Sequence, residues 1–243
     1  MTMSRAVRLV LWDVKDTLLR VRRSVGQQYC EEATRAGLTL SPAEVDTAFR
    51  RAYRQQSALY PNYGIAQGLG GQAWWARVVR DTFLQCGVRD EVLLDRLAHN
   101  LYHGFSRPEN WEVFSDSERT LRSCASLGLQ LGVVSNFDLR LESILHGYGL
   151  LPYFSFLVTS EGAGVAKPNP DIFRKALQKC GLPAASVAHV GDSYINDYLA
   201  ARSLGIRGFL LDRGGGEGSA QVPSEDRLLS LDELPSRLKQ NAD

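Results

Sequence analysis

The chain has 243 residues, of which 44% are hydrophobic, and a formal net charge of +1 at pH 7. This length suits one α/β domain with an inserted subdomain, or two small domains, and the near-neutral charge gives no support for a nucleic-acid or membrane partner. The four cysteines are far apart, which favours reduced thiols over a disulfide or zinc framework. No apolar run suits a signal peptide or reaches the roughly 20 residues of a membrane span. We therefore expect a soluble, cytoplasmic protein.

The first predicted element is a short buried strand over residues 9–12, an apolar run that ends at Asp13. In an open α/β sheet, ligands bind in the crevice at the carboxyl ends of the strands. A carboxylate placed there is partly desolvated and faces a ligand. Asp13 is therefore the first candidate for a nucleophile.

Residues 20–108 follow a helical period with few strand signals. A first helix, with Val25, Tyr29 and Ala33 on one face, is expected to end near Gly37. A second begins after Ser41, an N-cap residue that Pro42 follows. Further helices are expected around residues 74–83 and 90–101. The sequence thus predicts an all-helical subdomain over residues 20–108, inserted after the first strand.

Strands and helices alternate after Pro108. Strands are expected over residues 129–134, 156–159, 187–190 and 206–211, with helices over residues 117–127, 139–147, 170–180 and 198–204. This alternation predicts a doubly wound parallel sheet with right-handed crossovers, and hence an α/β fold class. The expected domains are an α/β core of residues 1–19 and 109–243 and the helical subdomain.

Polar residues follow or flank several of these strands. Ser135 and Asn136 end the second strand, Lys167 precedes a rigid Pro-Asn-Pro segment, and Gly191-Asp192 ends the strand 187–190, with Asp197 five residues further on. Taken singly, each has an ordinary interpretation: a turn or cap residue, a solvated lysine, an acidic pair. Together they predict side chains that converge at one edge of the sheet.

These features, in this order over residues 9–200, resemble the motifs of the haloacid dehalogenase-like (HAD) superfamily, in its form with a C1-type helical cap. The resemblance implies a Rossmann-like core and a cap that closes over the active site and excludes water. Asp13 and Thr17 match the first motif in type and spacing. The resemblance further implies that Asp13 is the nucleophile and that Thr17 contributes to substrate binding.

The other motifs imply the remaining roles. Ser135 and Asn136 would bind the substrate, and Lys167 would bind it and balance the charge of nucleophile and phosphoryl group. The metal is expected to be Mg²⁺, a cation that prefers oxygen ligands. Its expected ligands are Asp13, Asp192, the main-chain carbonyl of Lys15, and Asp197, the last directly or through water or Lys167. His189 is interpreted as a strand residue, not a base.

Lys15 departs from the family pattern. Phosphatases of the family carry a second Asp at this position as general acid and base, and Asp16 stands where Gly is usual. Lys15 could add positive charge beside the transferring group, which suits a good leaving group such as an acyl phosphate. It could serve as the acid/base itself, or pair with a site carboxylate and partly replace the metal. A lysine among carboxylates should keep its proton, which disfavours the acid/base role. Asp16 could act as the acid only if the loop were reset by one residue.

The resemblance implies a slow Mg²⁺-dependent phosphatase that uses an aspartyl nucleophile on a small phosphorylated metabolite. One alternative is a catalytically weak or inactive HAD-fold protein that binds a phosphorylated ligand or a protein partner. A second is a dehalogenase, because dehalogenase branches of the family also lack the second Asp. The Gly191-Asp192 and Asp197 pattern favours the phosphatase over the dehalogenase.

Overall fold

The computed structural model describes residues 6–216 and 218–239, which fold into two compact units. The first, the α/β unit, comprises the described parts of residues 1–20, 113–137 and 148–243. The second, the helical unit, comprises residues 21–112 and 138–147.

A parallel sheet forms the centre of the α/β unit. Its strands lie in the order β5-β4-β1-β6-β7-β8, so that β1 has β4 on one side and β6 on the other. The strands are β1 (Leu9–Trp12), β4 (Gln130–Ser135), β5 (Phe156–Thr159), β6 (Val187–Gly191), β7 (Arg207–Leu211) and β8 (Arg227–Leu228). Every residue of β1 is buried, as expected for a central parallel strand. The predicted doubly wound parallel sheet is thus confirmed.

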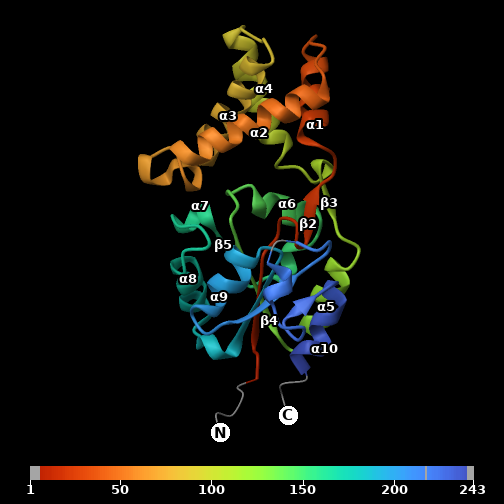
Figure 1. Cartoon of the computed structure of the whole chain (residues 1–243), viewed down its shortest axis with the longest axis vertical. Helices are drawn as coiled ribbons and strands as arrows, with labels where there is room; N and C mark the ends of the chain where they lie inside the picture. The colour runs from red at the N-terminus through yellow and green to blue at the C-terminus, as the bar shows by residue number, and fades with distance from the viewer. Residues whose placement is uncertain (1–5, 217, 240–243) are drawn as a thin grey trace. The chain divides into compact units, whose positions relative to one another are not determined.

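Helices cover both faces of this sheet (Figure 1). On one face, α8 (Asp171–Cys180) and α9 (Ala200–Arg202) contribute Phe173 and Ala201 to a core that includes Leu9 and Leu11 of β1. On the other face lie α5 (Ser117–Ser126) and α10 (Leu234–Lys239). Burying side chains on both faces leaves the ends of the strands as the place where polar residues can gather.

The helical unit contains α1 (Val25–Arg35), α2 (Pro42–Leu59), α3 (Gly71–Gln85), α4 (Glu91–Gly104) and α6 (Leu141–Gly147). Tyr29 and Phe83 stack in its core, with ring centroids 5.8 Å apart. The sequence predicts that the segment carrying α6 belongs to the α/β core. It lies in the helical unit because Asp138 accepts a hydrogen bond from Trp75 and Arg140 donates to the carbonyl of Tyr102.

Short elements complete the described chain. The strands β2 (Leu19–Val21) and β3 (Trp111–Val113) pair in a two-stranded sheet where the chain passes between the units. The remaining helical segments are η1 (Asn62–Gln67), η2 (Pro108–Asn110), η3 (Leu151–Tyr153), α7 (Ser160–Ala163), η4 (Ala184–Ser186), η5 (Tyr194–Leu199), η6 (Ser219–Gln221) and η7 (Leu231–Glu233).

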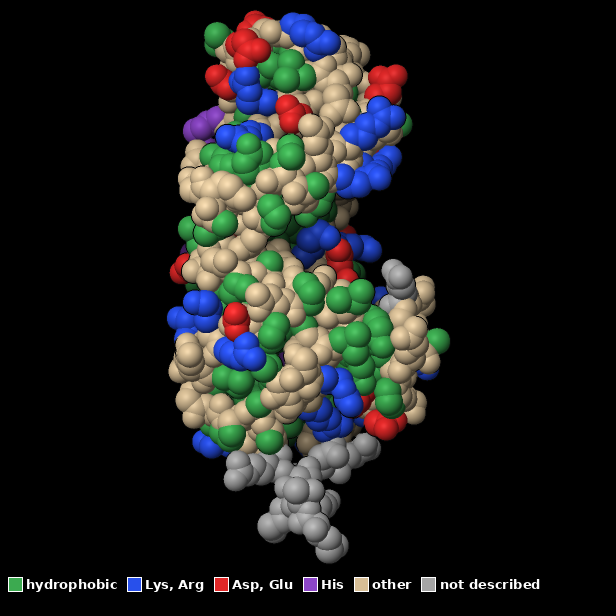
Figure 2. Space-filling model, turned by 60° about the vertical axis from the view of Figure 1, so that its left-hand side comes forward, with side chains coloured by type: hydrophobic (Ala, Val, Ile, Leu, Met, Phe, Trp, Pro, Cys, Tyr) green, Lys and Arg blue, Asp and Glu red, His purple; other side chains and the backbone are tan. Residues whose placement is uncertain are grey.

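Charged side chains of both signs occur across the face drawn in Figure 2, in keeping with a formal net charge of +1. Within residues 6–216 and 218–239, no helix combines the length and the apolar content needed to cross a bilayer.

Candidate active site

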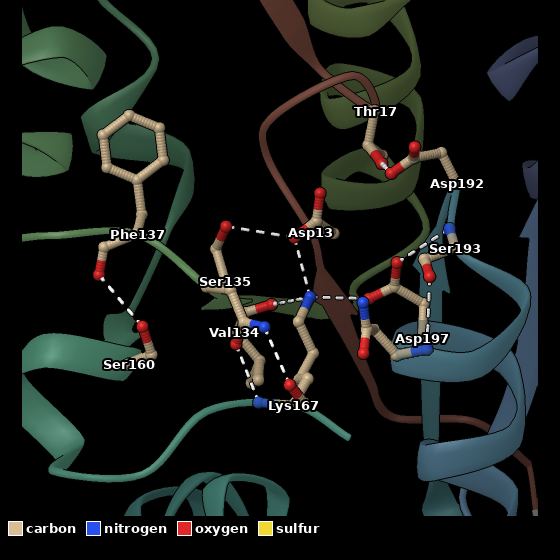
Figure 3. Close-up of polar contacts among 12 residues, drawn as sticks. Asp13, Thr17, Val134, Ser135, Phe137, Ser160, Lys167, Asp192, Ser193 and Asp197 are labelled. Atoms are coloured by element: carbon tan, nitrogen blue, oxygen red, sulfur yellow. Dashed lines mark hydrogen bonds and ion pairs between the residues drawn. The ribbon is translucent and has the colours of Figure 1, made fainter. Parts of the chain in front are cut away.

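Asp13 is the first residue after β1, and its backbone N–H donates to the carbonyl of Val190, at 2.9 Å. One carboxylate oxygen, Oδ1, accepts hydrogen bonds from Ser135 Oγ at 3.0 Å and from Lys167 Nζ at 2.7 Å (Figure 3). Among the described residues, the other oxygen, Oδ2, receives none. The carboxylate is therefore fixed through one oxygen and available through the other.

Lys167 is held by three acceptors. Its Nζ lies 2.7 Å from Asp13 Oδ1, 2.6 Å from Asp197 Oδ1 and 3.0 Å from the carbonyl of Val134. Burial acts to lower the pKa of Lys167, but Asp13 and Asp197 outweigh it and raise the pKa above its ordinary value. Lys167 is therefore a fixed ammonium between two carboxylates.

Asn136 holds the segment that carries this lysine. Its side-chain carbonyl accepts from the Lys167 backbone N–H at 2.7 Å, and its amide donates to the Lys167 carbonyl at 2.9 Å. The sequence predicts a substrate-binding role for Asn136. In this structure its amide group fixes the backbone at Lys167, which aims the ammonium at Asp13.

Asp197 lies in η5, a π-helical turn that Ser193 caps. Its Oδ1 contacts Lys167 Nζ and, at 2.9 Å, His189 Nε2, and its Oδ2 accepts from the Ser193 N–H at 3.0 Å. Burial acts to raise the pKa of Asp197, but Lys167 and His189 outweigh it and hold the pKa well below its ordinary value. Asp197 is an anion whose two oxygens are both engaged, so its main effect is to orient Lys167.

Asp192 follows β6 and is open to solvent on one side. Its Oδ1 accepts a hydrogen bond from Thr17 Oγ1 at 3.3 Å. Loss of part of its hydration, together with the negative charges of Asp13 and Asp197, raises the pKa of Asp192 to about 7. Thr17 is fully buried, so its hydroxyl in this structure positions Asp192.

The three aspartates fit a divalent cation. Asp13, Asp192 and Asp197 each offer a carboxylate oxygen, and these oxygens lie within 4.8 Å of one another. Burial, followed by the charge of Asp197, raises the pKa of Asp13, although Lys167 acts in the opposite direction. A positive charge near these oxygens would relieve this repulsion, and oxygen-only donors suit Mg²⁺. Asp13 and Asp192 would be the direct ligands, because both oxygens of Asp197 are already engaged.

Lys15 and Asp16 form an ion pair, with about half of each side chain exposed to solvent (52% and 48%). Asp16 has a backbone φ of +63°, in the left-handed region that favours Gly. This explains in physical terms why a glycine suits position 16. The Lys15 ammonium thus contacts the carboxylate of its neighbour in sequence.

The structure therefore brings together Asp13, Thr17, Ser135, Asn136, Lys167, Asp192 and Asp197, all of them predicted from the sequence. Sequence reasoning missed His189 as a partner of Asp197. The only local sign is its position on a buried strand that leads to Asp192. It also missed Arg213, which donates to the carbonyl of Thr17 at 3.1 Å and whose distance in sequence gives no signal.

Comparisons with known proteins agree with this arrangement. A family model described as haloacid dehalogenase-like hydrolase matches residues 7–205. The Haloacid dehalogenase-like hydrolase domain-containing protein 3 of Danio rerio is 66% identical to this chain, over 98% of both chains. The protein of the same name from Homo sapiens is 46% identical, over 84% of this chain and 82% of its own.

Solved structures with the same fold include a dehalogenase, a phosphatase and a protein bound to magnesium. The L-2-haloacid dehalogenase PA0810 superposes with a TM-score of 0.74 at 20% identity, covering 96% of this chain and 99% of its own. A HAD phosphatase from Thermococcus onnurineus gives 0.66 at 21% identity, covering 96% and 98%. YfnB from Bacillus subtilis, solved with magnesium, gives 0.71 at 15% identity, covering 96% and 99%. These likenesses establish the fold, and the family match together with the close relatives establishes membership: the chain belongs to the haloacid dehalogenase-like hydrolase family.

Proposed function

We propose that this protein is a slow, Mg²⁺-dependent phosphatase that acts on a small phosphorylated metabolite through Asp13. The observation that carries the proposal is the state of the Asp13 carboxylate. One oxygen is fixed by Lys167 and Ser135, and the other has no hydrogen bond within the described chain. A carboxylate oriented in this way is a preorganised nucleophile.

In the proposed reaction, Asp13 Oδ2 attacks phosphorus and the bond from phosphorus to the leaving oxygen breaks. Lys167 and the Ser135 hydroxyl, which lie beside Asp13, would stabilise negative charge on the phosphoryl oxygens. Mg²⁺, held by Asp13 and Asp192, would supply Lewis-acid polarisation of a phosphoryl oxygen. Water then displaces Asp13 from phosphorus, which releases phosphate and regenerates the carboxylate.

The leaving oxygen needs a proton unless it is already a stable anion. Lys15 occupies the place where the family's phosphatases carry an acid, and its ammonium pairs with Asp16. General acid–base help is worth about 10²- to 10⁴-fold, so its loss predicts slow turnover of alkyl phosphates. Substrates with good leaving groups, such as acyl phosphates, would suffer least.

The experiment measures phosphate release from acetyl phosphate and from an alkyl phosphate, with Mg²⁺, by four proteins. Asp13→Asn should abolish turnover of both substrates. Lys15→Asp should raise turnover of the alkyl phosphate by about tenfold or more, since it supplies the missing acid. Lys175→Asp, the same charge change at an exposed position on α8, is the control and should change nothing. Full activity in Asp13→Asn would rule out this site.

A second candidate is a HAD-fold protein that binds a phosphorylated ligand without turnover. The Lys15–Asp16 ion pair favours it. Position 15, where the family's phosphatases carry the general acid, here holds an ammonium that pairs with Asp16. Calorimetry with Mg²⁺ alone, and then with inorganic phosphate, distinguishes the two candidates. Phosphate binding by a protein that releases none from either substrate would support the second candidate.

The proposed location is the cytoplasm. All four cysteines are free thiols, two of them buried, which suits a reducing compartment.

A further inference from the structure

Arg213 joins three parts of the α/β unit that are distant in sequence. It follows the end of β7, and its guanidinium donates to both carboxylate oxygens of Asp116, each at 2.8 Å. The same guanidinium lies over the Phe114 ring, 4.1 Å from the centroid. From this position it donates to the backbone carbonyl of Thr17 at 3.1 Å. A bidentate ion pair thus aims one donor at the turn that follows Asp13.

Asp116 is itself held firmly. It is 4% exposed and also accepts from Ser230 Oγ at 2.9 Å and from the Leu231 N–H at 3.0 Å. Burial acts to raise the pKa of Asp116, but the hydrogen bonds from Arg213, Leu231 and Ser230 outweigh it and lower the pKa. Asp116 is therefore an anion at neutral pH, and it gives Arg213 a fixed anchor.

The turn from Asp13 to Leu19 needs such an anchor. The backbone N–H groups of residues 17, 18 and 19 all donate to the one carbonyl of Val14, and Asp16 adopts a left-handed conformation that costs free energy. Thr17 is held from two sides: Arg213 contacts its carbonyl, and its hydroxyl contacts Asp192. Movement of Thr17 would shift both the turn and Asp192.

We propose that Arg213, anchored by Asp116, is a positioning residue that fixes the Asp13–Leu19 turn so that Thr17 can hold Asp192 beside Asp13. Its effect on turnover rests on the proposed phosphatase activity. Its effect on the order of the turn does not.

Arg207 is a matched control at the other end of β7. It also lies over a phenylalanine, 4.5 Å from the Phe209 centroid, approaches one aspartate, Asp226, at 4.0 Å, and donates to a backbone carbonyl, that of Arg237. The exposed fractions of the two arginine side chains are nearly equal, 24% for Arg207 and 26% for Arg213. Within residues 6–216 and 218–239, Arg207 differs in contacting Asp226, Phe209 and Arg237 and not the Asp13–Leu19 turn. Its loss therefore reports the cost of removing such an arginine.

The experiment compares Arg213→Ala, Arg213→Lys and Arg207→Ala in the full chain. Hydrogen exchange of a peptide covering residues 13–19 is measured without ligand. Loss of a charged hydrogen bond predicts exchange about ten- to hundredfold faster in Arg213→Ala, with no change in Arg207→Ala. Arg213→Lys should fall between wild type and Arg213→Ala, because lysine keeps the charge but cannot contact Asp116 and the carbonyl as a planar fork. Equal exchange in Arg213→Ala and Arg207→Ala would overturn the proposal.

Two further measurements separate positioning from simple destabilisation. The dissociation constant for Mg²⁺ alone should rise in Arg213→Ala and stay at the wild-type value in Arg207→Ala. With acetyl phosphate, kcat should fall about tenfold or more in Arg213→Ala, with KM changed much less. A wild-type kcat in Arg213→Ala would refute the role. Absence of turnover in the wild type would refute the phosphatase proposal alone, and exchange over residues 13–19 would still decide the role of Arg213.

Discussion

The three site aspartates differ because their hydrogen-bond donors differ. Asp197 receives three donors through its two oxygens, whereas Asp13 receives two through a single oxygen. From the side chains of the described residues, Asp192 accepts a single hydrogen bond, donated by the Thr17 hydroxyl. Three aspartates thus differ in role: Asp197 orients Lys167, Asp13 has a free oxygen for nucleophilic attack, and Asp192 can coordinate a cation.

Asp16 gives a residue-scale prediction, because its φ of +63° is a conformation that glycine adopts without cost. The free energy of unfolding of Asp16→Gly should lie within about 1 kcal/mol of the wild-type value, because relief of backbone strain offsets the greater freedom of the unfolded chain. Asp16→Val should lower the free energy of unfolding by about 2 kcal/mol or more, because a β-branched residue tolerates this conformation poorly. Urea denaturation measures both variants, and equal stabilities for Gly and Val would contradict the backbone argument.

Asp116 gives a prediction for the pH dependence of stability. Its pKa is lowered in the folded state from the ordinary value of 3.8, so its ion pair contributes fully above that pH and the contribution is lost as the pH falls through the lower, folded pKa. At about pH 7, Asp116→Asn should reduce the free energy of unfolding by about 2 kcal/mol.

At about pH 3 the difference between wild type and Asp116→Asn should be smaller, since wild-type Asp116 then begins to lose its stabilising charge. Urea unfolding at both pH values tests this prediction. A difference that is the same at the two values would mean that the Asp116 charge does not stabilise the fold.

How far the site could be predicted depends on the distance between partners in sequence. Asp13 and Asp192 are marked locally, because each directly follows an apolar strand. The contact of Arg213 with Thr17 joins residues 196 positions apart, and that with Asp116 joins residues 97 apart. No local pattern encodes such pairs, so Arg213 was missed, whereas the polar residues that follow the strands were found.

At the scale of elements, apolar runs predicted the long strands well. The sheet is parallel and doubly wound as expected, because alternating strands and helices allow few other arrangements. The strands β2 and β3 have three residues each and no apolar run, so they were not anticipated. The helix expected over residues 198–204 is α-helical only in α9, Ala200–Arg202, because its first two residues belong to the π-helical turn η5. Tertiary contacts of Asp197 stabilise this turn, and propensity does not indicate it.

The segment 138–147 shows why tertiary contacts override chain order. Arg140 pairs with Asp138 in the helical unit, where the side chains are only 9% and 1% exposed, and Trp75 donates to the same carboxylate at 2.8 Å. The guanidinium also lies over the rings of Trp75 and Tyr102. A buried charge needs all of these partners, so this cluster fixes α6 in the helical unit.

Removing one partner of this buried pair is the prediction at the element scale. Arg140→Met should destabilise the helical unit by about 3–5 kcal/mol, because Asp138 would remain buried without its cation. Arg174→Met is the control: Arg174 pairs with Asp171 at an exposed site, with 54% and 55% of the side chains accessible, and should cost less than about 1 kcal/mol. Chemical denaturation compares them, and similar costs would show that burial of the Arg140 pair does not matter.

At the scale of the whole molecule, the chain crosses between the two units at four points, after residues 20, 112, 137 and 147. One crossing lies two residues beyond the end of β4, the strand that carries Ser135. Each unit nevertheless has its own hydrophobic core: Phe173 lies in that of the α/β unit and Phe83 in that of the helical unit.

Separate cores predict separable stability. Phe83 and Phe173 are both fully buried, so either Phe→Ala change should cost about 3–5 kcal/mol in its own unit. Phe83→Ala should speed hydrogen exchange in α1 to α4 and leave β1, β4 and β6 protected, whereas Phe173→Ala should do the reverse, each variant serving as the control for the other. If either change accelerated exchange equally in both units, the two units would unfold as one cooperative body, and the stability of each would depend on the other.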